Sequence, residues 1–346
     1  MKKKIGIIIA VLLLGMVVTA CENGGKEIAY EKEIVYDDSM EIVWKDKMLE
    51  KFVRQTISKP EGTLTYADVK NVKELDLKGV EIENIDDLQY FTNLEELYLA
   101  GCKVTDISAL GKLSHLKLFY VTGENSIDYS ALLEMESLTK LSLACREGLD
   151  FNYMKNLEQL TCLEIYSPIK DVDMFVTILN RNPDLKELGI QASELSDFSF
   201  FQKYKHKDKL EFLNISMQTA VNTNELKEFT NLQSLTMWRV DDLDCSGLGQ
   251  MTSLKELFLS ECTTQEDLPS QVSKLTNLER LHMPGFKLKD ISSLAGLTKL
   301  RYLDLYDNEI TDLSPLSNLS SLEILDIREN PVRDVAPVEH VPQLTY

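Results

Sequence analysis

A pattern of three hydrophobic residues, L-x-x-L-x-L, recurs along most of the chain. Its first residue stands at Val72, Leu94, Leu116, Leu138, Leu160, Leu185, Leu210, Leu232, Leu254, Leu278, Leu300 and Leu322. Eight of the eleven intervals are 22 residues long, two are 25 and one is 24. All 36 residues at the three pattern positions are hydrophobic, against 44% of the whole chain, so the recurrence is not a chance alignment. Such a period predicts stacked repeats, each of which packs only on its neighbours.

The period and the pattern together are typical of the leucine-rich repeat, in which each unit is one short strand and a return segment. We therefore expect an α/β solenoid over residues 72–346, with about twelve repeats in one curved parallel sheet. Alternation along a strand places repeat positions 1, 4 and 6 in the core and positions 3, 5 and 7 on the concave face. A helical turn is expected on the convex side at residues 176–188, and Leu344 is expected to begin a thirteenth unit.

The segment before the repeats, residues 41–71, is predicted to form a helical N-terminal cap. Its hydrophobic residues fall on one helical face at Met48, Leu49, Phe52, Val53 and Ile57. Pro60 is expected to end this helix, and Thr65 and Asp68 have the spacing of a capping box that opens a second short turn. A helix here would cover the exposed core of the first repeat, as the end of a solenoid requires.

Residues 1–20 have the features of an export signal: three lysines, a hydrophobic run from Ile5 to Val18, and small residues after it. The run is short compared with the roughly 20 residues that a membrane-spanning helix needs. The four residues Val18-Thr19-Ala20-Cys21 resemble the bacterial lipobox. This resemblance implies cleavage before Cys21, a lipid on its sulfur, and attachment to the outer side of the bacterial cell membrane. Residues 21–40 would then be a lipidated tether; an ordinary signal peptide followed by a chance cysteine is the alternative.

Residues 278–338 resemble the internalin family of bacterial surface proteins, because they follow its pattern L-x-x-L-x-L-x-x-N-x-I-x-D-I-x-P-L-x-x-L closely. Residues 94–113 match nearly as well. The middle of the array departs from the pattern, since the turn asparagine is present only at Asn308 and Asn330. The same column elsewhere holds Cys102, Arg146, Pro168, Val240, Cys262 and Phe286. The resemblance implies a binding module that attaches to a host or neighbouring surface.

Large aromatic side chains gather on the predicted concave face of four successive repeats. They are Trp238, Phe258, His282, Tyr302 and Tyr306, with Arg280 beside them, and Tyr98 and Tyr120 form a smaller group. Exposed aromatics in a continuous patch are typical of binding surfaces. A cross-strand ladder that only stabilises the sheet is the alternative. Flat rings with carboxylates near them also suit sugars, so we expect a protein or a glycan as the ligand.

The same face carries His282, Asp304 and Asp326 in one column of adjacent repeats. Arg280 and Arg328 lie beside this column in the repeat frame, so ion pairs are expected there in place of a metal. The sequence analysis finds no serine or cysteine to act as a nucleophile beside His282. Phosphate-binding and H-E-x-x-H motifs are also missing from the sequence. The sequence therefore predicts neither an enzyme nor a cofactor.

The chain is acidic, with 37 Lys and Arg against 56 Asp and Glu and a formal net charge of -19. Loss of the three lysines in the signal would make the mature protein more negative. Nucleic acid is therefore not expected as a partner, and the lipid on Cys21 would supply the contact with the membrane.

A second hypothesis concerns the end of the array. No cap is predicted after Val338, so the last strand would offer an open edge to another chain. In this alternative the protein is a structural or assembly component of the cell envelope, which associates with itself through its C-terminal repeat.

Overall fold

The computed structural model describes residues 36–123, 126–191, 195, 198–216, 221–264 and 267–346. The predicted signal peptide, Cys21 and the tether up to residue 35 lie outside the described residues. Residues 36–346 form one compact unit. Within the described part of the chain, no helix is both long and hydrophobic enough to cross a bilayer.

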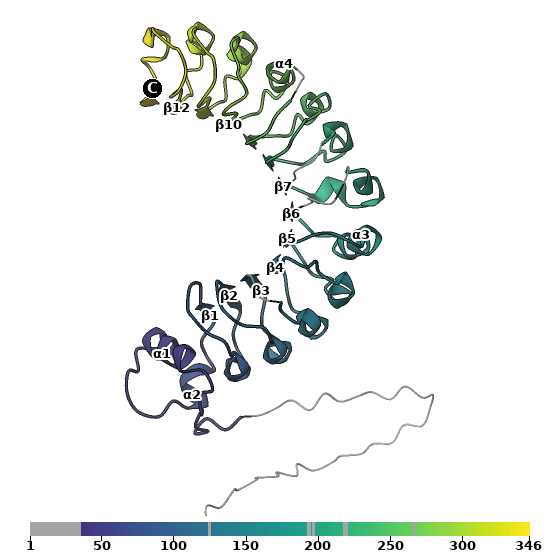
Figure 1. The fold of residues 1–346 in the computed structure, drawn as a ribbon, viewed down its shortest axis with the longest axis vertical. Coiled ribbons are helices and arrows are strands. Elements are labelled where there is room, and N and C mark those ends of the chain that lie inside the picture. Colours follow the sequence, from purple (N-terminus) through teal and green to yellow (C-terminus); the bar gives the residue numbers. More distant parts are fainter. Residues whose placement is uncertain (1–35, 124–125, 192–194, 196–197, 217–220, 265–266) are drawn as a thin grey trace, which may run out of the picture. The chain divides into compact units, whose positions relative to one another are not determined.

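The described residues build one sheet of thirteen parallel strands, which follow one another in chain order (Figure 1). The strands are β1 (Glu74–Asp76), β2 (Glu96–Ala100), β3 (Leu118–Thr122), β4 (Lys140–Ala144), β5 (Cys162–Tyr166), β6 (Glu187–Gln191), β7 (Phe212–Ser216), β8 (Ser234–Trp238), β9 (Glu256–Ser260), β10 (Arg280–His282), β11 (Tyr302–Asp304), β12 (Ile324–Asp326) and β13 (Gln343–Thr345). Equal repeat positions pair across the sheet, as Leu75 does with Leu97. The predicted leucine-rich-repeat solenoid is confirmed.

The return segments are helical and lie on the convex side of the curved sheet (Figure 1). Four of the described helices are α-helices: α1 (Lys47–Thr56), α2 (Tyr66–Val69), α3 (Val172–Arg181) and α4 (Leu268–Val272). The others are 3-10 helices: η1 (Asp86–Tyr90), η2 (Ser108–Lys112), η3 (Tyr129–Glu134), η4 (Phe151–Met154), η5 (Ser199–Lys203), η6 (Lys207–Lys209), η7 (Thr223–Glu225), η8 (Leu248–Gln250), η9 (Ser292–Gly296), η10 (Ser314–Leu316) and η11 (Ala336–Val338). The predicted convex helix is α3, which begins earlier than expected because Asp171 caps it. It also ends earlier, at Arg181, and the last two residues of the predicted range belong to strand β6.

The core is formed by the hydrophobic residues at positions 1, 4 and 6 together with hydrophobic residues of the return segments and of the N-terminal segment. Leu254, Leu257 and Leu259 are all fully buried, whereas Glu256 and Phe258 between them remain partly exposed. Burial of hydrophobic surface contributes roughly 25 cal/mol per Å². Since the hydrophobic edge of each repeat is covered only by the next repeat, the array is stable as a stack. The alternation predicted for the concave face is confirmed.

The turns after the strands differ along the array. The Asn308 side chain donates to the carbonyl oxygens of Met283 and Leu305, at 3.0 and 2.9 Å, and accepts from the backbone N–H of Leu288 at 3.0 Å. At the equivalent position, the Cys102 thiol donates to the carbonyl of Leu77 at 3.3 Å. Burial raises the pKa of Cys102 to about 11. A thiol therefore supplies a donor to this turn in place of the asparagine amide.

The segment before the repeats is helical where the sequence predicts it. Asp46 caps α1 by accepting from the N–H groups of Met48 and Leu49, at 2.8 and 3.1 Å. Leu49 and Val53 are buried in the core, but Met48 is 43% exposed, so its assignment to the inward face is wrong. Met48 lies one residue before Leu49, which turns it about 100° away from the buried stripe.

Two boundaries of this segment can be compared with the sequence analysis. Helix α1 ends at Thr56, before the predicted Pro60, because Ser58 has a positive φ of 57° and the chain leaves the helix there. The capping box is confirmed, since Asp68 Oδ2 accepts from the N–H of Thr65 at 2.7 Å. The extent of the cap, residues 41–71, stays a prediction.

The C-terminal residues form strand β13 against β12. Leu344 pairs with Leu325, which is repeat position 4, so the expectation that Leu344 begins a unit is wrong. Val341 takes the first hydrophobic position and is buried. The spacing from Leu322 to Val341 is shorter than 22 residues, which shifts the register of the last strand. Within the described residues, the outer edge of β13 is not paired with a strand.

Candidate functional site

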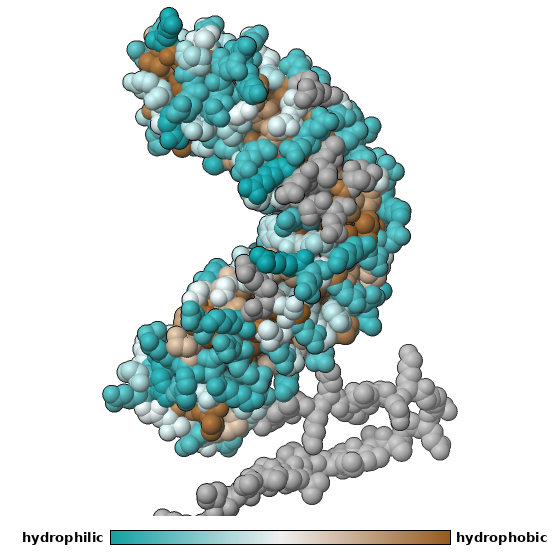
Figure 2. Space-filling view, viewed as in Figure 1, coloured by the Kyte–Doolittle hydropathy of each residue, from teal (hydrophilic) through white to brown (hydrophobic). Residues whose placement is uncertain are grey.

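The structure places the predicted aromatic residues of the C-terminal half together on the concave face. We call this group the C-terminal aromatic surface; it consists of Trp238, Phe258, Arg280, His282, Tyr302 and Tyr306, on or next to strands β8 to β11. Trp238 and Tyr306 are each 39% exposed, and both are large side chains. Much of the molecular surface seen in Figure 2 is hydrophilic.

Arginine side chains connect these rings. The Arg280 guanidinium lies between two of them, 5.6 Å from the centre of Phe258 and 4.8 Å from the centre of Tyr302. The Phe258 ring centre is also 6.0 Å from that of His282. Arg328 lies 5.5 Å from the Tyr306 ring. Cation–π contacts of this kind are worth about 0.5–1 kcal/mol when exposed, so the arginines hold the rings in place without covering them.

Trp238 is held by contacts that the sequence analysis missed. The guanidinium of Arg239 lies 4.3 Å from the indole ring. Glu261 accepts hydrogen bonds from Trp238 Nε1 at 3.1 Å and from Arg239 Nε at 2.9 Å. The hydrogen bond from Arg239 contributes most to holding the pKa of Glu261 below its ordinary value. Arg239 and Glu261, which lie just outside the concave columns, therefore orient the indole.

The ion pairs differ from those expected. Arg280 lies 3.8 Å from Glu256 rather than beside Asp304, so its predicted pairing is wrong. The strand register explains this, because Arg280 is directly opposite Glu256. Arg328 does pair with Asp326, with Nε 3.0 Å from Oδ1. Within the described residues, no group of three or more His, Cys, Asp or Glu side chains could hold a metal ion.

Asp304 pairs with His282 in place of an arginine. His282 Nδ1 lies 2.8 Å from Asp304 Oδ2, and Asp304 is only 8% exposed. Burial by itself would raise the pKa of Asp304. Hydrogen bonds from His282 and from the backbone N–H of Tyr306 outweigh this effect and hold the pKa below its ordinary value.

A serine lies beside His282, contrary to the sequence analysis. Ser260 Oγ is 2.8 Å from His282 Nε2. Ser260 is at repeat position 7 and His282 at position 5 of the next repeat, so both face the concave side as diagonal neighbours. The signal was therefore present in the sequence columns. The sequence prediction missed this pair because it compared residues at the same repeat position and not residues at different positions of adjacent repeats.

The smaller group, Tyr98 and Tyr120, is also brought together; we call it the N-terminal tyrosine pair. Its ring centres are 6.1 Å apart. The ammonium group of Lys78 lies 4.2 Å from the Tyr98 ring and 5.4 Å from the Tyr120 ring. Tyr98 also donates a hydrogen bond to Glu96 at 3.0 Å. Lys78 was not singled out from the sequence, although it occupies position 7 of the preceding repeat.

Between these two groups the concave face has a small hollow of about 170 Å³ over strands β5 to β8. Its lining consists of Glu164, Glu187, Leu188, Gly189, Phe212, Leu213, Asn214, Ser234 and Thr236. Gly189 helps to form it, because a Cβ atom there would lie 3.1 Å from Glu164 Cγ. None of the predicted site residues lines this hollow.

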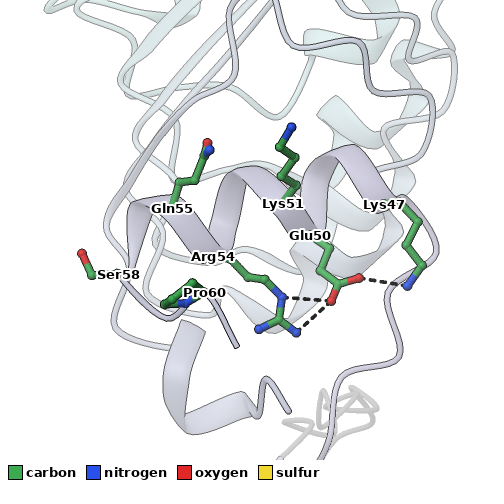
Figure 3. A pocket seen from close by; sticks show the side chains of 7 residues that line it. All are labelled: Lys47, Glu50, Lys51, Arg54, Gln55, Ser58 and Pro60. Atoms are coloured by element: carbon green, nitrogen blue, oxygen red, sulfur yellow. Dashed lines mark hydrogen bonds and ion pairs between the residues drawn. The ribbon is translucent and has the colours of Figure 1, made fainter. Parts of the chain in front are cut away.

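A larger hollow of about 470 Å³ runs along the outer side of α1 (Figure 3). Glu50 lies at its centre and accepts hydrogen bonds from Lys47 at 2.9 Å and from Arg54 Nε at 3.1 Å. Lys51 and Gln55 project from the helix without joining this network (Figure 3). The side chains of Lys47, Glu50 and Arg54 are paired with one another, and the hollow contains none of the predicted site residues.

Comparisons with known proteins agree with this architecture. A family model described as leucine-rich repeats in two copies matches residues 70–112 and 298–340. The structure of an internalin, InlF, from Listeria monocytogenes is similar with a TM-score of 0.63 and 22% identity, over 88% of this chain and 96% of that one. A leucine-rich-repeat protein of Leptospira interrogans, LIC12759, is similar with a TM-score of 0.61 and 21% identity, over 80% of this chain and 72% of that one.

The fold is that of a leucine-rich-repeat solenoid. Its repeats are internalin-like, as the sequence analysis predicts. The two segments that match the family model overlap those in which the internalin pattern is clearest.

Proposed function

We propose that this protein is a lipid-anchored bacterial cell-surface binding protein, which uses its concave face to bind a protein or a glycan. The observation that carries the proposal is the C-terminal aromatic surface. Trp238 and Tyr306 each remain 39% exposed, so a large aromatic area is available to a ligand. Exposed aromatic side chains next to arginines are the chemistry of binding hot spots.

The arrangement of the rings favours binding in a second way. Arg239 and Glu261 fix the indole of Trp238, and Arg280 lies between Phe258 and Tyr302. A side chain that is already ordered loses little conformational entropy when a ligand covers it. The flat, open surface fits either the face of a sugar ring or the side chains of a protein, so both classes belong to the proposal.

The ligand is found by screening the soluble protein, residues 22–346, on a glycan array and against extracellular-matrix proteins. The double variant Trp238→Ala/Phe258→Ala is screened beside it. We expect a ligand whose binding is lost in the double variant. A ligand that binds both proteins equally would contradict a role for the C-terminal aromatic surface.

The membrane anchor rests on the signal sequence and Cys21, as the sequence analysis describes. In a bacterial host, the full chain should incorporate radiolabelled palmitate and fractionate with the membrane. Cys21→Ala should abolish both while the repeat array still folds. Incorporation of label into Cys21→Ala would refute the proposed lipidation site. Tight anchoring requires more than one acyl chain, each buried methylene contributing about 0.8 kcal/mol.

A second candidate function, self-association in the cell envelope, is favoured by the open edge of β13. The backbone groups of that edge are not paired with another strand among the described residues, and Tyr346 beside it is 76% exposed. Sedimentation at increasing concentration would reveal dimers, and removal of residues 340–346 would abolish them. A monomer at all concentrations would rule this candidate out.

A further inference from the structure

Three side chains on adjacent strands of the concave face are hydrogen-bonded in series. Ser260 at the end of β9 lies 2.8 Å from Nε2 of His282 in β10. Nδ1 of His282 lies 2.8 Å from Oδ2 of Asp304 in β11. A hydroxyl, an imidazole and a buried carboxylate in this order are the components of an activated serine. We propose that Ser260 is a nucleophile and that this site hydrolyses carboxylic esters.

The roles of the three groups follow from their surroundings. Asp304 is 8% exposed and is fixed by the backbone N–H of Tyr306, which donates to its Oδ1 at 2.9 Å. Its other oxygen faces His282 Nδ1, so the imidazole carries its proton on Nδ1. Nε2 is then left to accept the proton of Ser260. Asp304 is a positioning residue, while Ser260 and His282 are catalytic residues.

The neighbouring groups suit a nucleophilic serine. Cys262 is two residues away, but burial raises its pKa to about 11, so the thiol does not compete at neutral pH.

The reaction is balanced by proton transfers through His282. As Ser260 Oγ forms a bond to the acyl carbon, its proton passes to His282 Nε2. The bond from the acyl carbon to the leaving oxygen breaks, and that oxygen takes the proton from Nε2 and departs as an alcohol. Water then attacks the acyl-serine and gives its proton to Nε2; Oγ leaves the acyl carbon and recovers that proton. Ester and water become alcohol and carboxylic acid.

The open face defines the class of substrate. Ser260 is partly exposed on a continuous sheet, with Trp238 opposite it in the neighbouring strand and the Phe258 ring against His282. Ser260 lines neither the hollow along α1 nor the hollow over strands β5 to β8. An ester displayed on an extended ligand, such as an acylated polymer, therefore fits better than a small molecule that needs a deep pocket.

The test uses the full chain and a fluorophosphonate probe, which forms a covalent bond with activated serines. We expect one labelled site, mapped to Ser260 by peptide mass spectrometry, and no labelling of Ser260→Ala. His282→Gln should slow labelling at least 100-fold. Ser142→Ala is the matched control, since Ser142 lies on the same face but donates to Glu164 at 2.8 Å and has no histidine partner. It should label like the wild type.

A second assay separates positioning from folding. Hydrolysis of p-nitrophenyl acetate should fall on the order of 10³-fold or more in kcat with Asp304→Asn, with KM unchanged, by analogy with other serine triads. Asp304→Glu retains the negative charge and should hydrolyse the ester faster than Asp304→Asn. If Asp304 had only a structural role, the hydrolysis rate of each variant would follow its melting temperature instead. A wild type that labels and hydrolyses no faster than Ser260→Ala would overturn the proposal and leave a hydrogen-bonded ladder on the sheet.

Discussion

The N-terminal tyrosine pair and the C-terminal aromatic surface are built on the same scaffold but differ in charge. The tyrosines share one cation, Lys78, and lie among the carboxylates of Glu74, Asp76 and Glu96. On the C-terminal surface each of three arginines has one carboxylate partner. Carboxylates outnumber the cation at the N-terminal pair, whereas each arginine at the C-terminal surface is balanced, so we expect the N-terminal pair to repel anionic groups more strongly.

The comparison shows where specificity resides in this fold. Both regions have hydrophobic residues at positions 1, 4 and 6, so their cores are equivalent. They differ at positions 3, 5 and 7, which contribute little to the core and can vary freely. Four predictions test how far the two regions differ, starting with the largest expected effect.

Removal of the aromatic rings should affect binding at one region only. Trp238→Ala/Phe258→Ala should weaken ligand binding by about 2–4 kcal/mol, because both rings lose their contact area. Tyr98→Ala/Tyr120→Ala should change the affinity by less than about 0.5 kcal/mol. Isothermal titration with the ligand found in the screen measures both. Equal losses in the two double variants would mean that the ligand spans the array.

The turn chemistry should make the C-terminal half more sensitive to mutation. Asn308→Ala removes a buried donor and an acceptor and should cost about 2–3 kcal/mol of unfolding free energy. Cys102→Ala removes one weak sulfur donor and should cost about 1 kcal/mol. Urea unfolding followed by circular dichroism compares them. If Cys102→Ala lowered the unfolding free energy more than Asn308→Ala, the turn at Asn308 would not be the more strongly stabilised one.

The buried carboxylate should make stability depend on pH in the C-terminal half. Hydrogen bonds hold the pKa of Asp304 below the unfolded value of about 3.9. Its contribution is therefore fully present above that value and is lost as the pH falls through the folded pKa. Asp304→Asn should cost on the order of 1–2 kcal/mol at pH 7. The unfolding curves of the two proteins should converge toward pH 2; a constant difference at all pH values would contradict this origin.

The arginine between the rings should have the smallest effect. Arg280→Gln removes its two cation–π contacts and should weaken ligand binding by about 0.5–1 kcal/mol. Lys78→Gln is the counterpart at the N-terminal tyrosine pair and should leave the affinity unchanged. A fluorescence titration of Trp238 detects the first effect. A larger loss with Lys78→Gln would reverse the assignment of the binding region.

The sequence was a good guide to features that repeat. The hydrophobic period predicted the parallel sheet and nearly all the core residues at repeat positions 1, 4 and 6, because each repeat follows the same local rule. The capping box of Thr65 and Asp68 was found for a similar reason, since both residues belong to one short turn. Such features depend on contacts that are local or equal from one repeat to the next.

The sequence was a poorer guide where contacts run diagonally between repeats. It paired Arg280 with the aspartate column, but strand register places Glu256 opposite it. It missed Ser260 beside His282 because the two residues belong to different columns of the repeat. It also misplaced Leu344, since the last return segment is shorter than the others.

The sequence by itself determined the repeat architecture, the face on which each strand residue lies and the acidic character of this protein. Burial of hydrophobic residues at a fixed period leaves only one such arrangement. The tertiary structure alone decided which polar side chains meet, including the series from Ser260 to Asp304. These contacts depend on side-chain rotamers and on the register of neighbouring strands. A repeat period of 22 residues does not determine whether two side-chain atoms lie 2.8 Å apart.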